Sequence, residues 1–215
     1  MKVIRSPFRA ADLRDGHANA WDSVDEATLV LSPSPIAMTE PVSPYMAITT
    51  GHGSIKRLSV QMAHDDTILS LRLSWPDPDR DDDPADLDQF VDAVSVMFPL
   101  APGASAYTMG SHDKPVNAWL WRADESTPLD VLAEGYATSR RRPGEMSRLT
   151  VNSYHDNDTW VVVFQRPMKI DGEAFVSIEA GGELGIAFAV WEGSNRERSA
   201  AKAVSGEFTN VSVDV

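Results

Sequence analysis

The chain has 215 residues, of which 42% are hydrophobic, a share typical of folded globular proteins and too high for a disordered chain. Its formal net charge of −13 argues against nucleic acid as a partner, because phosphate contacts need clustered lysine and arginine, and it also disfavours an anionic membrane surface. The absence of cysteine excludes disulfides, cysteine-ligated iron–sulfur clusters and haem attached through thioether bonds. Any cofactor must therefore be held by other side chains without covalent attachment.

Short apolar runs, separated by many of the 14 prolines and 13 glycines, predict a β-rich fold. We expect strands at residues 27–31, 55–61, 68–75, 160–164, 174–178, 185–191 and 207–213. The run 68–75 alternates most cleanly, so one face of that strand should be apolar and the other polar. The apolar face would carry Leu69, Leu71, Leu73 and Trp75, and the polar face Ser70, Arg72 and Ser74.

Residues 154–160 (YHDNDTW) predict a hairpin turn between strands at 149–153 and 160–164. Helical periodicity is weak, and residues 87–97 are the best candidate for a helix. Strands every ten to fifteen residues, with polar turns between them, favour an antiparallel β-sandwich or flattened barrel with a few short helices. Similar strand patterns throughout favour a single domain over residues 1–215.

An acidic loop begins at Asp77 and ends at Asp88, with aspartate at seven of its twelve positions (DPDRDDDPADLD). Alternating carboxylates suit a hard cation such as calcium. The segment lacks the glycine at the sixth position and the closing glutamate of an EF-hand loop, so a solvated loop is the favoured interpretation.

Known catalytic motifs are missing from the sequence. It has no glycine-rich nucleotide loop, no G-x-S-x-G and no paired histidines at metal-binding spacing. No apolar run reaches the length of a membrane-spanning helix, and the first twenty residues lack the apolar region of a signal peptide. Taken alone, these features indicate only a β-rich domain, and the missing signal peptide would suggest the cytoplasm.

Three segments carry a more specific signal: residues 43–60 (SPYMAITTGHGSIKRLSV), 88–123 (DQFVDAVSVMFPLAPGASAYTMGSHDKPVNAWLWRA) and 185–208 (GIAFAVWEGSNRERSAAKAVSGEF). Together they resemble the haem-binding gamma subunit of ethylbenzene dehydrogenase and of related steroid C25, dimethylsulfide, selenate and chlorate enzymes. The Thr-Met-Gly step and the closing Ser-Gly-Glu-Phe resemble the hydrocarbon-hydroxylating branch more than the oxyanion reductases.

The resemblance implies one non-covalent haem b, held between two sheets, with a methionine and a lysine as axial iron ligands. These ligands fall on Met109 and Lys202. A methionine ordinarily fills gaps in the core, and a lysine ordinarily faces solvent. A ligating lysine must be neutral, so burial and the adjacent iron must hold its pKa well below the usual 10.4 or so.

Haem-pocket positions follow from the same motifs. We expect them at Phe98, Asn117, Trp119, Phe188 and Trp191, although buried aromatic residues are more often ordinary core. Asn117, Lys114 and Arg122 are candidates to meet the haem propionates. The basic run Arg140, Arg141 and Arg142 is more typical of a solvated turn.

The implied function is that of a non-catalytic electron-transfer subunit in a periplasmic, molybdenum-dependent hydrocarbon dehydrogenase. A molybdenum-pterin alpha subunit would oxidise the substrate, and an iron–sulfur beta subunit would pass electrons to this chain. The gamma chain would itself hold neither molybdenum nor an iron–sulfur cluster, and would reduce a soluble acceptor such as a cytochrome. Export would depend on a partner subunit that bears a signal.

The alternative is a β-sandwich module that binds a ligand such as carbohydrate, because fold does not fix function. Trp119 and Trp121 would then form an exposed stacking platform.

Overall fold

The computed structural model describes residues 1–41, 43–172 and 174–215, and within them the chain is mainly β, as predicted. The strands are β1 (Lys2–Arg5), β2 (Ala27–Val30), β3 (Ser32–Pro33), β4 (Arg57–His64), β5 (Ile68–Pro76), β6 (Ala93–Pro99), β7 (Val116–Arg122), β8 (Leu129–Ala133), β9 (Arg140–Pro143), β10 (Thr150–Asp156), β11 (Thr159–Pro167), β12 (Glu183–Trp191), β13 (Ala203–Val204) and β14 (Thr209–Val213). The helices are short: η1 (Ala10–Leu13), η2 (Asn19–Ser23), α1 (Ile36–Thr39), η3 (Pro44–Ala47) and η4 (Gly144–Ser147). Within the described ranges, no helix has the length and apolar character needed to cross a membrane.

The strands form one mixed sheet in the order β10-β11-β5-β4-β1-β14-β12-β6-β7-β8-β9, which is not closed into a barrel. Strand β1 joins its two halves because it pairs with β4 on one side and with β14 on the other. Both of these pairings are parallel, so the sheet departs from the purely antiparallel arrangement that we expected. Parallel neighbours need a long connection, and here η1, η2 and β2 lie along the chain between β1 and β4.

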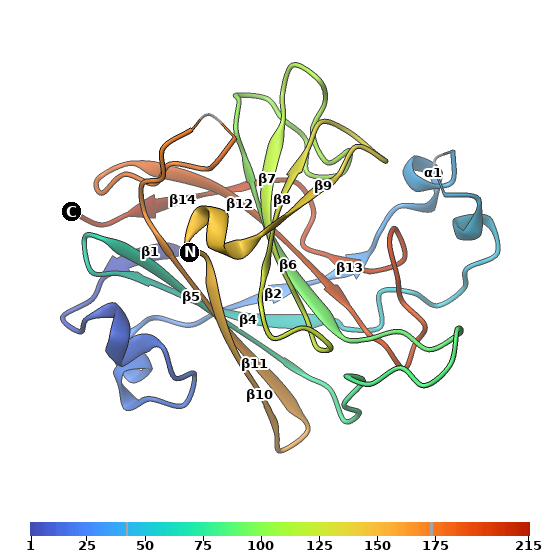
Figure 1. The fold of residues 1–215 in the computed structure, drawn as a ribbon, viewed down its shortest axis with the longest axis horizontal. Coiled ribbons are helices and arrows are strands. Elements are labelled where there is room, and N and C mark those ends of the chain that lie inside the picture. The colour runs from blue at the N-terminus through green and yellow to red at the C-terminus, as the bar shows by residue number, and fades with distance from the viewer. Residues whose placement is uncertain (42, 173) are drawn as a thin grey trace.

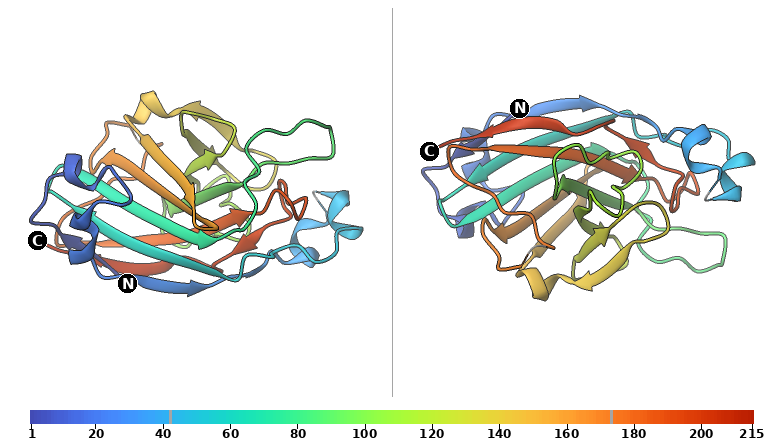
Figure 2. Two further views of the ribbon diagram at one scale, coloured as in Figure 1. Left: turned by 90° about the horizontal axis from the view of Figure 1, so that it is seen from below. Right: turned by 90° about the horizontal axis from the view of Figure 1, so that it is seen from above.

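The two halves pack face to face as a sandwich (Figures 1 and 2). Aromatic side chains from the two halves pack against each other. The ring centroids of Trp75 on β5 and Trp121 on β7 are 6.2 Å apart, and those of Phe164 on β11 and Trp119 on β7 are 6.3 Å apart. The main core draws on β4, β5 and β11 from one half and on β6, β7, β12 and β14 from the other. Burial of large apolar side chains between the layers stabilises the fold.

The alternation predicted for residues 68–75 is confirmed on β5. Its four apolar residues are buried in the main core, whereas Arg72 on the opposite face donates a hydrogen bond to the carbonyl of Gly16, 2.8 Å away. The hairpin is also confirmed: β10 and β11 pair in register up to Asp156 and Thr159. Asn157 and Asp158 form its turn with φ of 49° and 55°, as a two-residue hairpin turn requires.

Two predicted elements are wrong. Residues 87–97 do not form a helix, because the segment is irregular up to Asp92 and then enters strand β6. Strand β6 is largely buried on both faces, which hides the alternating pattern in the sequence. Residues 174–178 form no strand. The N–H of Val176 donates to the Asn117 side chain, and the N–H of Ile178 makes an isolated backbone bond to the carbonyl of Met168. The prediction of a single domain stays a prediction.

Trp119 provides a test of this packing. It is completely buried, so Trp119→Ala should lower the free energy of unfolding by about 3–5 kcal/mol. Leu87→Ala is the control, because Leu87 is 95% exposed and its truncation should change stability by less than about 0.5 kcal/mol. Urea denaturation of both variants measures the difference, and equal stabilities would contradict the assignment of Trp119 to the core.

Candidate haem cavity

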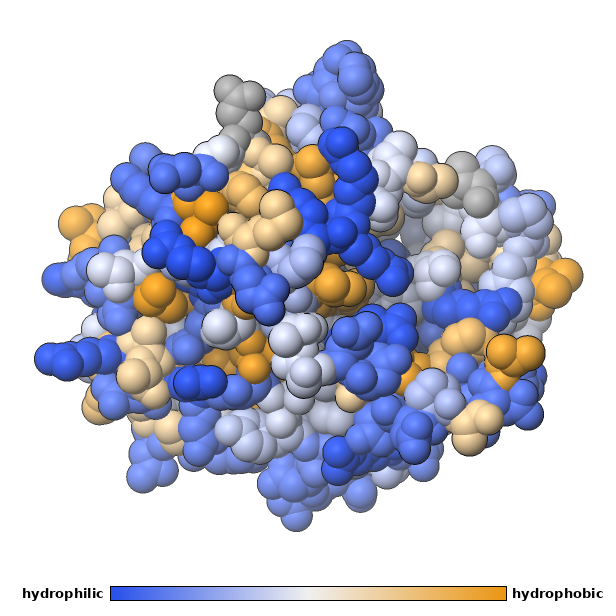
Figure 3. Space-filling model, in the orientation of Figure 1, coloured by the Kyte–Doolittle hydropathy of each residue, from blue (hydrophilic) through white to orange (hydrophobic). Residues whose placement is uncertain are grey.

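A cavity of about 400 Å³ lies against the layer of β12, β6, β7 and β8. Its size falls within the range of roughly 300–1,000 Å³ that is usual for small-molecule sites. Other segments complete its walls: residues 34–39 and Ser43 around α1, residues 106–109 before β7, residues 136–141 at the start of β9 and before it, and residues 199–206 around β13. The surface is hollowed right of centre in Figure 3, in the region between α1 and the β8–β9 turn of Figure 1.

Small side chains in register form the floor of the cavity. One row across the sheet runs from Ala187 on β12 through Met97 on β6 to Ala118 on β7 and Val131 on β8. The next row runs through Ala189, Ser95 and Leu120. Because several of these positions hold only alanine or serine, the strands leave space above this face of the layer.

The cavity does not lie between the two layers, where the resemblance led us to expect the haem. The residues that alternate with the floor, such as Val94, Val96 and Phe98 on β6, point into the packed core between the layers. Successive side chains on a strand point to opposite faces, so the same strands supply the core on one side and the cavity floor on the other.

Met109 lines the cavity from the loop between β6 and β7. Its backbone is left-handed, with φ of 57°, a conformation that costs energy for a residue other than glycine and that clusters at functional sites. Backbone hydrogen bonds hold this conformation. The Met109 N–H donates to the carbonyl of Ala106, and the Met109 carbonyl accepts from the N–H of Gly135, 3.0 Å away. The thioether is therefore presented by a defined turn.

Gly110 follows with φ of 79°, and a Cβ there would lie 2.6 Å from the carbonyl oxygen of Lys114. Only glycine fits at that point, which explains the Thr-Met-Gly step. The same loop is tied to the segment after Lys202, because the Glu207 carboxylate accepts hydrogen bonds from the Ser105 hydroxyl and from the Ala106 N–H. Glu207 therefore links two motif blocks that lie far apart in the sequence, a role that the sequence alone did not reveal.

Lys202 lines the cavity from the opposite motif block, directly before β13. Its Nζ lies 4.7 Å from the centroid of the Trp191 ring, and the Trp191 indole N–H donates to the carbonyl of Ser199, 3.0 Å away. Burial lowers the pKa of Lys202 to about 8, and no carboxylate among the described residues raises it. At pH 7 about a tenth of the amine is then neutral, far more than for an exposed lysine.

Four of the seven predicted site residues line this cavity: Met109, Lys202, Phe188 and Trp191. Phe188 is also part of the main core, because it pairs with Val96 on the core face of the layer. Phe98, Asn117 and Trp119 do not line it. Phe98 and Trp119 pack together in the main core, with ring centroids 4.7 Å apart. Asn117 is buried and donates to Asp130 on β8, 2.9 Å away. These three residues occupy the core side of β6 and β7.

The candidate propionate partners also lie elsewhere. Arg122 pairs with Asp124, and neither Arg122 nor Lys114 lines the cavity. The lining instead includes Arg141, which belongs to the basic run that we expected to be only solvated. The two neighbouring arginines form ion pairs within this chain, Arg140 with Glu134 and Arg142 with Asp130. The pairing of Val131 with Arg141 places this side chain at the end of a floor row, a position that the sequence could not reveal.

A family model described as ethylbenzene dehydrogenase matches residues 18–148 and 142–203 of the sequence. The chain belongs to the ethylbenzene dehydrogenase family. Both Met109 and Lys202 lie within the matched residues.

Curated proteins similar to this member of the ethylbenzene dehydrogenase family have related names. The protein named "Putative respiratory nitrate reductase heme subunit ORF7" of Haloferax mediterranei is 35% identical over 87% of this chain and 64% of its own length. The chlorate reductase subunit gamma of Ideonella dechloratans is 35% identical over 74% of this chain and 65% of its own length. The dimethylsulfide dehydrogenase subunit gamma of Rhodovulum sulfidophilum is 32% identical over 69% and 57%. The chain thus spans somewhat less than two thirds of the length of these relatives.

Among solved structures, the chain is similar to a family 9 carbohydrate-binding module from Caldicellulosiruptor kristjanssonii in complex with glucose. The TM-score is 0.51 at 12% identity, and the alignment covers 100% of this chain and 96% of that one. A second structure of that module, with cellotriose, gives a TM-score of 0.50 at 13% identity, covering 100% and 93%. At such low identity the likeness concerns the fold alone.

The lowered pKa of Lys202 predicts a specific pH dependence of stability. Between about pH 8 and pH 10.5 the folded protein has released this proton while the unfolded chain still holds it, so stability should rise with pH across that window. Lys202→Met should remove this rise and stabilise the haem-free protein at pH 7 by about 3 kcal/mol.

Lys169→Met is the matched control, because the Lys169 side chain is 72% exposed. Thermal unfolding of the haem-free variants from pH 7 to pH 10.5 provides the measurement. The same pH profile in the wild type and in Lys202→Met would contradict the burial of an uncompensated amine.

Proposed function

We propose that this chain is a non-catalytic electron-transfer subunit that binds one haem b in the cavity, with Met109 and Lys202 as axial iron ligands. The observation that carries the proposal is that these two residues, from motif blocks far apart in the sequence, line one cavity. The name of the Haloferax mediterranei relative supports haem as the ligand. When bound, haem iron supplies a one-electron ferric–ferrous couple.

The residues present fit such a group. Lys202 has apolar surroundings that favour the neutral amine, the form that can donate a lone pair to a metal. Met109 offers a thioether, a soft ligand that favours ferrous iron and a high reduction potential. The floor has no charged side chain and holds alanine or serine at several positions, which leaves room for a planar ring, and Trp191 adds an apolar wall.

Arg141 is proposed to hold a propionate at the edge of the cavity. An arginine can bind a carboxylate with two parallel hydrogen bonds, and this guanidinium is exposed at the lining rather than buried in the core. The assignment replaces Asn117, Lys114 and Arg122 in that role.

The chain would act in a complex with a molybdenum-pterin alpha subunit and an iron–sulfur beta subunit, and we place this complex in the periplasm. The gamma-subunit names of the chlorate reductase and dimethylsulfide dehydrogenase relatives support membership of a larger enzyme. The Thr108-Met109-Gly110 step favours a hydrocarbon dehydrogenase within the family. The net charge of −13 suits docking of a basic electron acceptor such as a cytochrome.

The alternative function, a carbohydrate-binding module, would need Trp119 and Trp121 as an exposed surface on which a sugar can stack. Trp119 is 0% exposed and Trp121 is 1% exposed, so neither ring can stack on a sugar at the surface. The fold shared with carbohydrate-binding modules does not change this conclusion, because one fold supports many functions.

Haem titration tests the ligand assignment. Met109→Ala and Lys202→Ala should each weaken haem binding by roughly tenfold or more and change the visible spectrum, because each removes one bond to iron. Met109→His should bind haem but lower its reduction potential by on the order of 100 mV, since imidazole favours ferrous iron less than a thioether does.

The controls are Met146→Ala and Lys169→Ala, because both side chains are largely exposed and lie outside the cavity lining. They should leave the affinity and the spectrum unchanged. Wild-type spectra from both Met109→Ala and Lys202→Ala would refute the ligation.

Arg141 has a matched control in its neighbour. Arg141→Ala should weaken haem binding by about tenfold, the effect of losing one charge-assisted contact near the surface. Arg140→Ala should not, because Arg140 faces Glu134 and does not line the cavity. Competition for haem against apomyoglobin compares the affinities of the two variants. Equal affinities would contradict a role for Arg141 in haem binding.

A further inference from the structure

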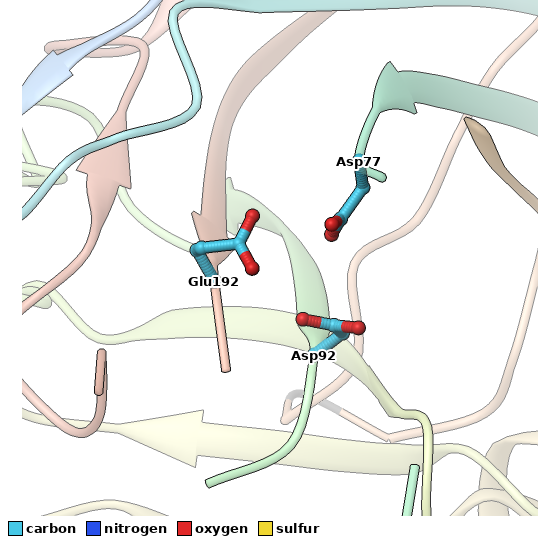
Figure 4. Close-up of side chains that lie close together, drawn as sticks. All are labelled: Asp77, Asp92 and Glu192. Atoms are coloured by element: carbon cyan, nitrogen blue, oxygen red, sulfur yellow. The ribbon is translucent and has the colours of Figure 1, made fainter. Parts of the chain in front are cut away.

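Three buried carboxylates meet at one end of the sandwich, outside the cavity lining. Asp77 follows β5, Asp92 precedes β6 and Glu192 follows β12, and they are 0%, 0% and 5% exposed. One oxygen from each lies within 4.8 Å of the others. Figure 4 shows the three side chains turned toward a common centre.

The hydrogen bonds at this cluster are unevenly distributed. Asp92 accepts from the N–H groups of Asp81 and Gly193 and from the indole of Trp160, each 2.9 Å away. Glu192 accepts from the Ser194 hydroxyl at 2.8 Å. The Oδ2 atom of Asp77 has no hydrogen-bond partner although it is fully buried.

Such an oxygen is costly unless something binds it, because a buried polar atom loses its water without replacement. Burial raises the pKa of all three carboxyl groups, that of Asp77 to about 8, and no cationic side chain among the described residues lowers any of them. The centre of the cluster is therefore suited to a positive charge.

We propose that Asp77, Asp92 and Glu192 bind one divalent cation, with calcium preferred. Hard cations take carboxylate oxygens, and calcium tolerates a flexible arrangement of ligands, whereas magnesium demands near-ideal octahedral geometry. Because one oxygen of each carboxylate lies within 4.8 Å of the others, a single ion can contact all three with little movement. The unpartnered Asp77 oxygen becomes a ligand.

The cation would fasten the two layers together, because Asp77 belongs to the half that contains β5, whereas Asp92 and Glu192 flank strands of the other half. Gly193 already lies close against the loop that precedes β6, since a Cβ there would clash with the carbonyl oxygen of Phe90. The segment that begins at Glu192 leads to Lys202, so calcium would also fix the start of the loop that carries this residue.

The signal in the sequence was the acidic loop that starts at Asp77. The structure divides it, because Asp77 is buried in the cluster, whereas residues 78–80 and 83–88 are exposed as a solvated loop should be. The other two carboxylates lie outside the acidic loop, so its composition alone could not reveal the site.

Calcium titration of the chelator-treated full chain tests the proposal. We expect one equivalent to bind by calorimetry and to raise Tm by roughly 5–10 °C at a hundredfold excess over Kd. Asp77→Asn should weaken binding by roughly tenfold or more, whereas Asp83→Asn, in the exposed part of the loop, should leave it unchanged.

Terbium provides a readout that does not depend on the stability of a variant. Tb³⁺ bound in the wild-type cluster should show luminescence sensitised by Trp160, whose indole donates to Asp92, and Ca²⁺ should displace it. The proposal is overturned if neither ion binds the chelator-treated wild type, or if Asp77→Asn and Asp83→Asn bind calcium equally.

Discussion

Strands β6, β7 and β12 form a layer that is covered on both faces, and the strict alternation of side chains along these strands sets the rest of the structure. On one face Val96, Trp119 and Phe188 pair across the layer and pack into the core. On the other face Met97, Ala118 and Ala187 pair in the same way and form the floor of the cavity. A shift of one residue in register would exchange the two sets, filling the cavity with indole rings and emptying the core.

Ionisable side chains lie on either side of the step from Trp191 to Glu192: the amine of Lys202 and a cluster of three buried carboxylates. The Trp191 ring faces the amine of Lys202 in the cavity, whereas Glu192 turns toward Asp77 and Asp92. Neither group is neutralised by an opposite charge from the described part of the chain, which is unusual for buried ionisable residues. The two proposed metals would account for both in the same way, since iron would receive a neutral amine and calcium would receive carboxylates.

Much of the fold could be predicted because the signals were local. The apolar face of β5 and the turn at Asn157 and Asp158 follow from alternation and turn chemistry within a few residues. The helix expected at 87–97 failed because burial of both faces of β6 hides the period of two. The cavity could not be predicted, because the sequence does not show which face of a doubly buried strand it lies on. Phe98 and Trp119 look suited to a haem pocket, but only the pairing of the strands shows that they point to the core. Met109 and Lys202 came from the family motifs, and nothing in their own patterns distinguishes them from ordinary residues.

The most direct test of the account is the position of the iron. Anomalous diffraction at the iron edge, from crystals of the haem-loaded chain, locates the metal without assumptions about its ligands. The account predicts a single iron in the cavity above Ala118 and Ala187, bonded to the sulfur of Met109 and to Nζ of Lys202. An iron between the two layers, or one bonded to other side chains, would contradict it.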